Sequence, residues 1–369
     1  AHEMGHQFGA YHTFSHINEG MGASVEPGSG STIMGYAGIT GSNNVQSHGD
    51  PYFHAKSIEN ITAYITEISC YASTPVSNQP PVVDAGPDYF IPIGTAYALT
   101  ATATDPEGDT LYYTWEQMDD GNIENENFGP TNFSGALARS LPPTTSPIRS
   151  IPNEAAVRAG TLTQTTPNIY SSWETVATVG RTMNWTVTAR DRFAEAGTSG
   201  GRTHRDDFLL TVVDTQQPFT VLPNETDVPW KIGARRLVRW EVANTNLAPI
   251  VVETVSIFLS TDDGETFPYL LTDSAANDGE AWVTVPIDAT TTIARIKVAA
   301  NNNIFYALSS SSFDILSRPY YLTFSDYTQL SCDSETVTYN FSFVTTTNEN
   351  ATVAAHQIPE GFNVTITPT

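Results

Sequence analysis

Residues that can support metal chemistry stand at fixed spacing near the start of the 369-residue chain, in the stretch HEMGHQFGAYH. In a helix, His2 and His6 would lie one turn apart on the same face, where two imidazoles can share one zinc ion. Glu3 follows the first histidine and can take a proton from an attacking water without being a ligand. The spacing therefore predicts a zinc hydrolase site with Glu3 as general base.

Gly9 and His12 complete this pattern. Glycine enters left-handed backbone space without a Cβ penalty, so Gly9 can end the helix abruptly. The chain can then turn and bring His12 back towards the metal. Three neutral histidines leave one tetrahedral position open for water, as a catalytic zinc site requires. We therefore expect His2, His6 and His12 to hold zinc (Zn²⁺).

The complete pattern, H-E-x-x-H-x-x-G-x-x-H, resembles the signature of the metzincin metallopeptidases. Metzincins also carry a methionine-containing turn, the Met-turn, and the stretch GSGSTIMGYAG places Met34 in a similar setting. The resemblance implies that Met34 is not a ligand but forms an apolar floor beneath the imidazoles. Tyr36 matches the position at which some metzincins carry a tyrosine that reaches the zinc or the transition state.

Within this clan the chain most resembles the bacterial reprolysin-like, or adamalysin-type, family, through EPGSGSTIMGYAGITGSNNVQ and DPYFHAKSIENITAYI. Two positions depart from the family pattern. Adamalysins usually carry an aspartate after the third histidine, where this chain has Thr13. They also tend to carry a cysteine before the Met-turn, where this chain has Thr32. The departures concern the family within the clan and leave the expected zinc ligands intact.

The resemblance implies a secreted zinc endopeptidase that acts on protein or peptide substrates. Tyr36 would donate a hydrogen bond to the developing oxyanion. Residues 37–39 would line the pocket for the side chain after the cut bond. Because the chain begins at Ala1, inside the catalytic helix, we expect a signal peptide and the first half of the catalytic domain to precede it. We expect little or no activity from these 369 residues alone.

A second helix is predicted in the stretch DPYFHAKSIENITAYITEISCY, which begins at residue 50. Asp50 suits the N-cap and Pro51 the first helical position. Isoleucines at positions 58, 61, 65 and 68 recur every three or four residues, which gives the helix one apolar stripe. We expect that stripe to pack beneath the Met-turn.

The hydrophobic period then changes from helical to alternating, with Trp115 on one of the expected strands. The predicted fold is multidomain: the C-terminal part of an α+β metzincin catalytic domain, followed by all-β immunoglobulin-like sandwiches. The predicted divisions are the C-terminal half of the peptidase domain (1–72), a linker (73–81), an immunoglobulin- or PKD-like sandwich with a long insertion at about 117–175 (82–215), a second immunoglobulin- or fibronectin-like domain (217–317) and the start of a truncated β-module (318–369).

Composition limits the partners. The net charge is −24, with only 16 basic residues, which argues against binding nucleic acid or an anionic membrane surface. No stretch is long and apolar enough to span a membrane. The two cysteines, Cys70 and Cys332, fall in different predicted domains, so we do not expect them to pair.

Two smaller motifs lie in the predicted β-domains. Asp105, Glu107 and Asp109 stand close together in TDPEGDT, and oxygen ligands at alternate positions could hold calcium (Ca²⁺), although an ordinary acidic turn has the same pattern. The stretch STDDGETF matches an Asp-box hairpin. A single copy without a repeat favours a stable β-turn over a glycan-active propeller.

An alternative function comes from another class. Most of the chain is predicted β-module, so the protein could be an adhesin or a surface-binding protein in which the peptidase is auxiliary or inactive. The β-modules could then bind extracellular proteins or glycans. The intact set of expected ligands and base favours the peptidase.

Overall fold

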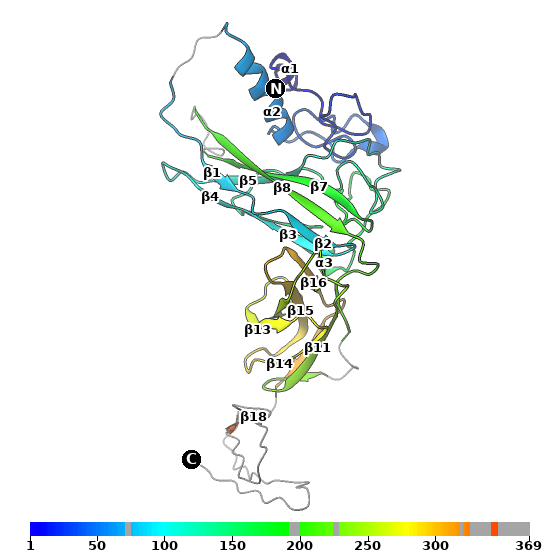
Figure 1. Cartoon of the computed structure of the whole chain (residues 1–369), viewed down its shortest axis with the longest axis vertical. Helices are drawn as coiled ribbons and strands as arrows, with labels where there is room; N and C mark the ends of the chain where they lie inside the picture. Colours follow the sequence, from blue (N-terminus) through cyan, green and yellow to red (C-terminus); the bar gives the residue numbers. More distant parts are fainter. Residues whose placement is uncertain (71–74, 192–199, 224–228, 318–319, 325–340, 346–369) are drawn as a thin grey trace, which may run out of the picture.

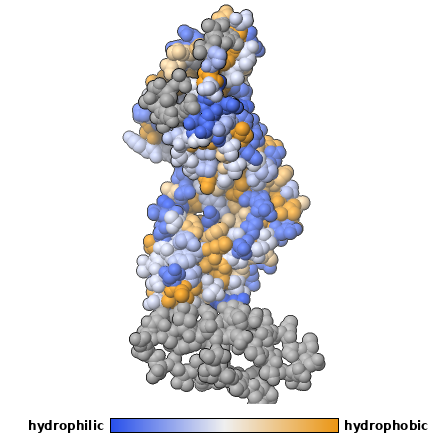
Figure 2. Space-filling view, turned by 90° about the vertical axis from the view of Figure 1, so that its left-hand side faces the viewer, coloured by the Kyte–Doolittle hydropathy of each residue, from blue (hydrophilic) through white to orange (hydrophobic). Residues whose placement is uncertain are grey.

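The computed structural model describes residues 1–70, 75–191, 200–223, 229–317, 320–324 and 341–345. The N-terminal helices lie at one end of an elongated arrangement, and β-sheets follow one another along its length (Figure 1). On the face seen in Figure 2, hydrophobic residues form small patches among hydrophilic ones. In the described part of the chain, no helix is long and apolar enough to cross a membrane.

The N-terminal part consists mainly of irregular turns around three short helical elements. These are α1 (His2–Gln7), the 3₁₀ helix η1 (Gly41–Asn43) and α2 (Ala55–Glu67). Helix α1 is followed by Gly9 at φ +86°, a left-handed conformation that glycine adopts without strain. A Cβ at Gly9 would also lie only 2.8 Å from Cβ of Tyr64 on α2, so glycine permits close packing of the two helices.

Helix α2 begins later than the sequence predicts. His54, and not Asp50, is its N-cap, because the His54 ring nitrogen Nδ1 accepts a hydrogen bond from the Lys56 backbone nitrogen at 3.0 Å. The predicted isoleucine stripe is only partly buried, and Ile68 lies beyond the last helical residue. The fully buried side chains of α2 are instead Ala55 and Ser57, at its first turn. Capping by a histidine side chain is rarer than capping by aspartate, so the pattern at residue 50 was misleading.

The first β-region has two facing layers. One is a four-stranded sheet in the order β2-β8-β7-β5, with Trp115 on β5 as predicted. The other layer includes β3, whose Tyr97 ring packs edge-on against Trp185 of β7, with 6.3 Å between centroids. The elements of this region are β1 (Val82–Asp84), β2 (Tyr89–Pro92), β3 (Ala96–Thr100), β4 (Thr102–Thr104), β5 (Tyr112–Gln117), β6 (Ile148–Ile151), α3 (Glu154–Arg158), β7 (Arg181–Arg190) and β8 (Thr203–Val213).

The second β-region is joined to the first through a shared sheet. Strand β16 pairs antiparallel with β3, with Phe305 opposite Tyr97 and Tyr306 opposite Ala96. A smaller sheet, in the order β14-β11-β9, lies beside the shared one. The strands are β9 (Thr220–Val221), β10 (Trp230–Lys231), β11 (Arg235–Glu241), β12 (Thr254–Ser260), β13 (Tyr269–Ala276), β14 (Glu280–Thr284), β15 (Thr291–Ala300), β16 (Phe305–Leu308) and β17 (Phe313–Leu316).

The last described elements, β18 (Tyr320–Phe324) and β19 (Phe341–Thr345), pair antiparallel. The rest of the expected third module, with Cys332, lies outside the described residues, whereas Cys70 is an exposed free cysteine. The predicted fold class is confirmed: a small helical N-terminal part precedes mostly β-sheet domains that resemble immunoglobulin-like folds.

The segment at 117–175, predicted as an insertion, holds more structure than expected. Its strand β6 pairs with β3 and so belongs to the sandwich. Other residues of the segment contact the N-terminal part, where Ile123, Phe128 and Trp173 form a buried cluster with Val45. The periodicity of this segment gave no sign of that contact, because the partners are more than seventy residues away in sequence.

Candidate metal centre

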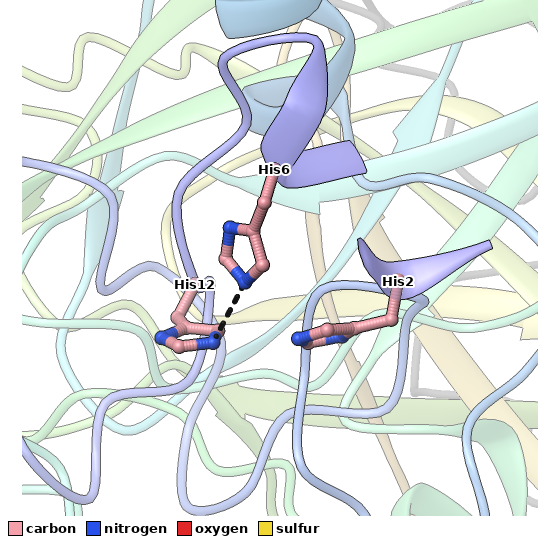
Figure 3. Close-up of side chains that lie close together, drawn as sticks. All are labelled: His2, His6 and His12. Carbon is pink, nitrogen blue, oxygen red and sulfur yellow. Dashed lines mark hydrogen bonds between the residues drawn. The ribbon is translucent and has the colours of Figure 1, made fainter. Parts of the chain in front are cut away.

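His2, His6 and His12 converge on one point (Figure 3). One ring nitrogen of each lies within 4.8 Å of the others, and Nε2 of His6 is 3.1 Å from Nε2 of His12. Within the described residues these three form the one group of histidine, cysteine or acidic side chains with such spacing. Two come from one face of α1, and the third follows the turn at Gly9.

The other nitrogen of each ring is held by an oxygen acceptor. Nδ1 of His2 lies 2.7 Å from the carbonyl oxygen of Ile33, and Nδ1 of His6 lies 2.8 Å from that of Ala10. Nδ1 of His12 lies 3.0 Å from the carboxylate of Glu19. Carbonyl and carboxylate oxygens accept hydrogen bonds, so each Nδ1 is placed to donate, and the Nε2 of a neutral imidazole with a protonated Nδ1 has a lone pair for a metal.

This arrangement fits a metal ion. Nε2 of His6 and Nε2 of His12 lie 3.1 Å apart, close enough for both to bind one cation. Tetrahedral zinc with nitrogen ligands at about 2.0–2.1 Å would hold them roughly 3.3 Å apart. The hydrogen-bonded Nδ1 atoms match the outer contacts that orient metal-bound imidazoles. The set of three neutral nitrogen donors therefore fits Zn²⁺.

Glu3 lies in the first turn of α1, beside His2, and its side chain is exposed to solvent. Glu3 and His2 lie in the same turn of α1, His6 lies one turn later, and His12 follows the helix.

Met34 packs against α1, and Tyr36 lies beside two of the imidazoles. Met34 is fully buried, and a Cβ added at Gly5 of α1 would overlap its sulfur atom. The ring of Tyr36 lies 4.6 Å from the ring of His12 and 5.4 Å from that of His2, between centroids. The turn at residues 33–36 therefore packs under α1 and beside two of the three imidazoles.

Two carboxylates at the site were not foreseen from the sequence. Glu19 contacts His12, and the buried Glu26 accepts hydrogen bonds from the hydroxyls of Thr13 and Thr32, both at 2.5 Å. Glu26 also accepts from the backbone nitrogen of Ser31 at 2.9 Å. The sequence did contain a sign of their importance, because Glu19 and Glu26 are the only acidic residues between His12 and Asp50.

The two departures from the adamalysin pattern thus meet at one point. Thr13, where the family has aspartate, and Thr32, where it has cysteine, both donate to Glu26. The buried Glu26 carboxylate thus accepts hydrogen bonds from both hydroxyl groups. These hydrogen bonds link the segment after His12 to the segment before the Met-turn.

The remaining histidines of this part have other surroundings. His16 packs against the ring of Phe14, with 4.6 Å between centroids, and burial lowers the pKa of His16. His54 is buried as the cap of α2. Both lie outside the group of converging ring nitrogens, as does His48.

The acidic turn has a local hydrogen-bond pattern. Asp105 Oδ1 accepts from the backbone nitrogens of Glu107 and Asp109, at 3.0 and 2.9 Å, while Glu107 Oε1 accepts from that of Gln79 at 3.3 Å. Across the described residues, these three side chains do not form a group with metal-ligand spacing. Calcium binding here stays a prediction.

Residues 1–69 match the model of the reprolysin-like metallo-peptidases of family M12B. The match supports the metzincin resemblance at the start of the chain and a role related to metallopeptidases. No curated protein sequence matches the chain.

Solved structures overlap with the chain only weakly. A Bacteroides ovatus mixed-linkage glucan utilization locus protein, SGBP-B, in complex with a heptasaccharide, is 13% identical over 65% of this chain and 48% of its own, with a TM-score of 0.19. The N-terminal four immunoglobulin domains of Dscam1 isoform 1.9 are 10% identical over 66% of this chain and 47% of theirs, with a TM-score of 0.18. The I-band fragment I67-I69 of titin is 11% identical over 71% and 86%, with a TM-score of 0.20. The chain therefore matches about half the length of the first two, and overlap at this level indicates neither shared ligands nor shared partners.

Proposed function

We propose that the N-terminal part belongs to a secreted zinc-dependent endopeptidase. One observation supports this proposal above all. Three imidazoles converge through Nε2 while each Nδ1 is fixed by an oxygen acceptor. His2, His6 and His12 would hold the zinc ion. Zinc bound there supplies Lewis acidity, which polarises a peptide carbonyl and makes water more acidic.

Side chains of the protein carry out proton transfer and stabilise the oxyanion. The carboxylate of Glu3 accepts a proton from the attacking water and passes it to the leaving amine nitrogen. The phenol of Tyr36 donates a hydrogen bond to the developing oxyanion. Ile39, which is 75% exposed, follows these residues and would contact the substrate side chain after the cut bond.

Metal analysis and mutation test this function. Purified protein should contain one zinc per chain, and His6→Ala or His12→Ala should abolish it. In the complete natural protein, Glu3→Gln should keep zinc but lower the rate of casein hydrolysis by about 10²–10⁴-fold, the usual contribution of a general base. A Glu3→Gln enzyme as fast as wild type would refute the role of Glu3.

We further propose the domain division 1–72, 73–81, 82–215, 217–317 and 318–369, with the β-domains serving as targeting modules. One observation favours binding to an extracellular protein or glycan. Trp282 on β14 is 56% exposed, and the Arg235 guanidinium lies 5.0 Å from its ring centroid. Aromatic faces of this kind suit stacking on a ligand. If the protein is retained on insoluble glycans or proteins and the Trp282→Ala variant is not, the result would support this role. If the wild-type protein is not retained, the β-domains would act as simple spacers.

Calcium at Asp105, Glu107 and Asp109 is a separate proposal, supported by their alternate spacing in one turn. Bound calcium would stabilise the first β-domain. The melting temperature should then rise with calcium and fall with a chelator. Identical melts in both conditions would refute it.

A further inference from the structure

The segment that follows β5 contacts the loop between the third histidine and the Met-turn. The backbone of Ile123 lies between two parts of that loop: its nitrogen donates to the Ser15 carbonyl, and its carbonyl accepts from the Gly28 nitrogen, both at 2.8 Å. The Ile123 side chain is buried with Phe128 and Trp173. The first β-region therefore supplies a segment that is hydrogen-bonded to the N-terminal part on both sides.

Asp120 is a charged residue that this segment contributes to the contact. Its Oδ1 accepts a hydrogen bond from the Ser24 nitrogen at 2.9 Å, and its Oδ2 accepts one from Asn18 Nδ2 at 3.1 Å. Asn18 in turn accepts a hydrogen bond at Oδ1 from the Gly20 nitrogen at 2.7 Å. Asp120 and Asn18 thus fix a turn in which Glu19 is the middle residue.

That turn has few other anchors. Gly20 and Gly22 have positive φ values of 74° and 64°, and a Cβ added at either would meet no atom within 4 Å. Open space around both glycines means that packing does little to hold the turn in place. The hydrogen bonds that Asp120 accepts are therefore the main restraint that the β-region places on this turn.

Glu19 transmits this restraint to the metal centre. Its carboxylate accepts from His12 Nδ1 at 3.0 Å for one oxygen and 3.1 Å for the other. A carboxylate in this position sets the orientation of the imidazole and increases its basicity towards a metal. The position of Glu19 therefore affects how well Nε2 of His12 can bind zinc.

We propose that Asp120, in the β-region, is a positioning residue for the zinc site, acting on His12 through Asn18 and Glu19. This rests on the proposed zinc-binding function. The first β-region is then a structural part of the metal centre and not only a spacer or targeting module.

Zinc affinity of the 369-residue protein tests the proposal. The variants are Asp120→Ala, Asn18→Ala and the double variant, with Asp120→Asn as a milder change. Glu126→Ala is the matched control, since it removes an exposed negative charge from the same segment. Affinity is measured by competition with a chromophoric chelator, and folding by circular dichroism.

Asp120→Ala should bind zinc more weakly than wild type by up to about 10-fold, the lower limit for losing a direct partner of a metal ligand. Asp120→Asn should weaken zinc binding less than Asp120→Ala does. Glu126→Ala should bind as wild type does. The visible spectrum of the cobalt(II)-substituted protein should change in Asp120→Ala but not in the control, because it reports ligand geometry. The Asn18→Ala and Asp120→Ala effects should add only in part, since both variants break the hydrogen bond between Asn18 and Asp120.

Each contrary result has a distinct meaning. Equal zinc affinity and equal cobalt spectra in Asp120→Ala and Glu126→Ala would overturn this inference while leaving the zinc site intact. Additive effects of Asn18→Ala and Asp120→Ala would overturn the route through Asn18. Failure of the wild-type chain to bind one equivalent of zinc would overturn the proposed function itself.

Discussion

The Thr13 hydroxyl donates a 2.5 Å hydrogen bond to the carboxylate of Glu26, a side chain that is 1% exposed. Thr13 directly follows the third histidine, and the same carboxylate accepts from the Thr32 hydroxyl and the Ser31 nitrogen before the Met-turn. A buried carboxylate is stable only when hydrogen bonds replace its hydration. Glu26 therefore links two segments that must keep a fixed separation around the imidazoles.

Glu26→Gln should destabilise the N-terminal part. The glutamine amide offers one acceptor oxygen and one NH₂ group, so donors that met the second carboxylate oxygen lose their acceptor. Each buried donor left without an acceptor costs about 1–3 kcal/mol. Thermal and denaturant unfolding should show the loss. Glu67→Gln, at an exposed position on α2, is the control, and equal stability of the two variants would contradict the role of Glu26.

Glu19→Gln should weaken zinc binding by about 10-fold, because a neutral amide stabilises the His12 imidazole less than a carboxylate does. Thermal stability of the metal-free protein should change little, since the Glu19 side chain is 41% exposed. Chelator competition measures the first effect and calorimetry the second. Zinc affinity equal to that of Glu67→Gln would show that Glu19 does not support His12.

Gly9→Ala should destabilise the protein by more than 1 kcal/mol, the rough cost of placing a Cβ in left-handed backbone space. Here the Cβ would also lie 2.8 Å from Cβ of Tyr64. Gly20→Ala separates these effects, because Gly20 has φ +74° and open space around it. Denaturant unfolding should give a larger loss for Gly9→Ala. Equal losses would mean that contact with α2 contributes nothing.

The sequence predicted the parts of the site that depend on local spacing. The three converging histidines, Glu3 and Gly9 are separated by only a few residues. Helical geometry relates His2 to His6, and the glycine turn brings His12 back towards them. Glu26 was missed because its donors are several residues away in both directions and come together only in the folded loop. The strands around Trp115 followed from alternation, whereas the docking of Ile123 depends on contacts between distant segments that periodicity does not encode.

The Asp-box turn leads to a pH prediction. Burial acts to raise the pKa of Asp262, but hydrogen bonds from Ser260 and Thr266 outweigh it and lower the pKa to about 2. Thr266 donates both its hydroxyl, at 2.5 Å, and its backbone nitrogen, at 2.9 Å. An unfolded aspartate has a pKa of about 3.9. A folded pKa below the unfolded value means that the ionised carboxylate stabilises the fold.

This stabilisation should be complete above about pH 4 and be lost as the pH falls through about 2, where the folded carboxylate takes up its proton. Asp262→Asn should therefore melt at a lower temperature than wild type at pH 7, and the gap should narrow between about pH 4 and pH 2. Asp278→Asn, at an exposed turn in the same β-region, is the control. A gap for Asp262→Asn that stays constant from pH 7 to pH 2.5 would show that its ionisation does not stabilise the turn, and the Asp-box would then owe its stability to Ser260 and Gly264, whose nitrogen donates to the Ser260 hydroxyl at 2.8 Å.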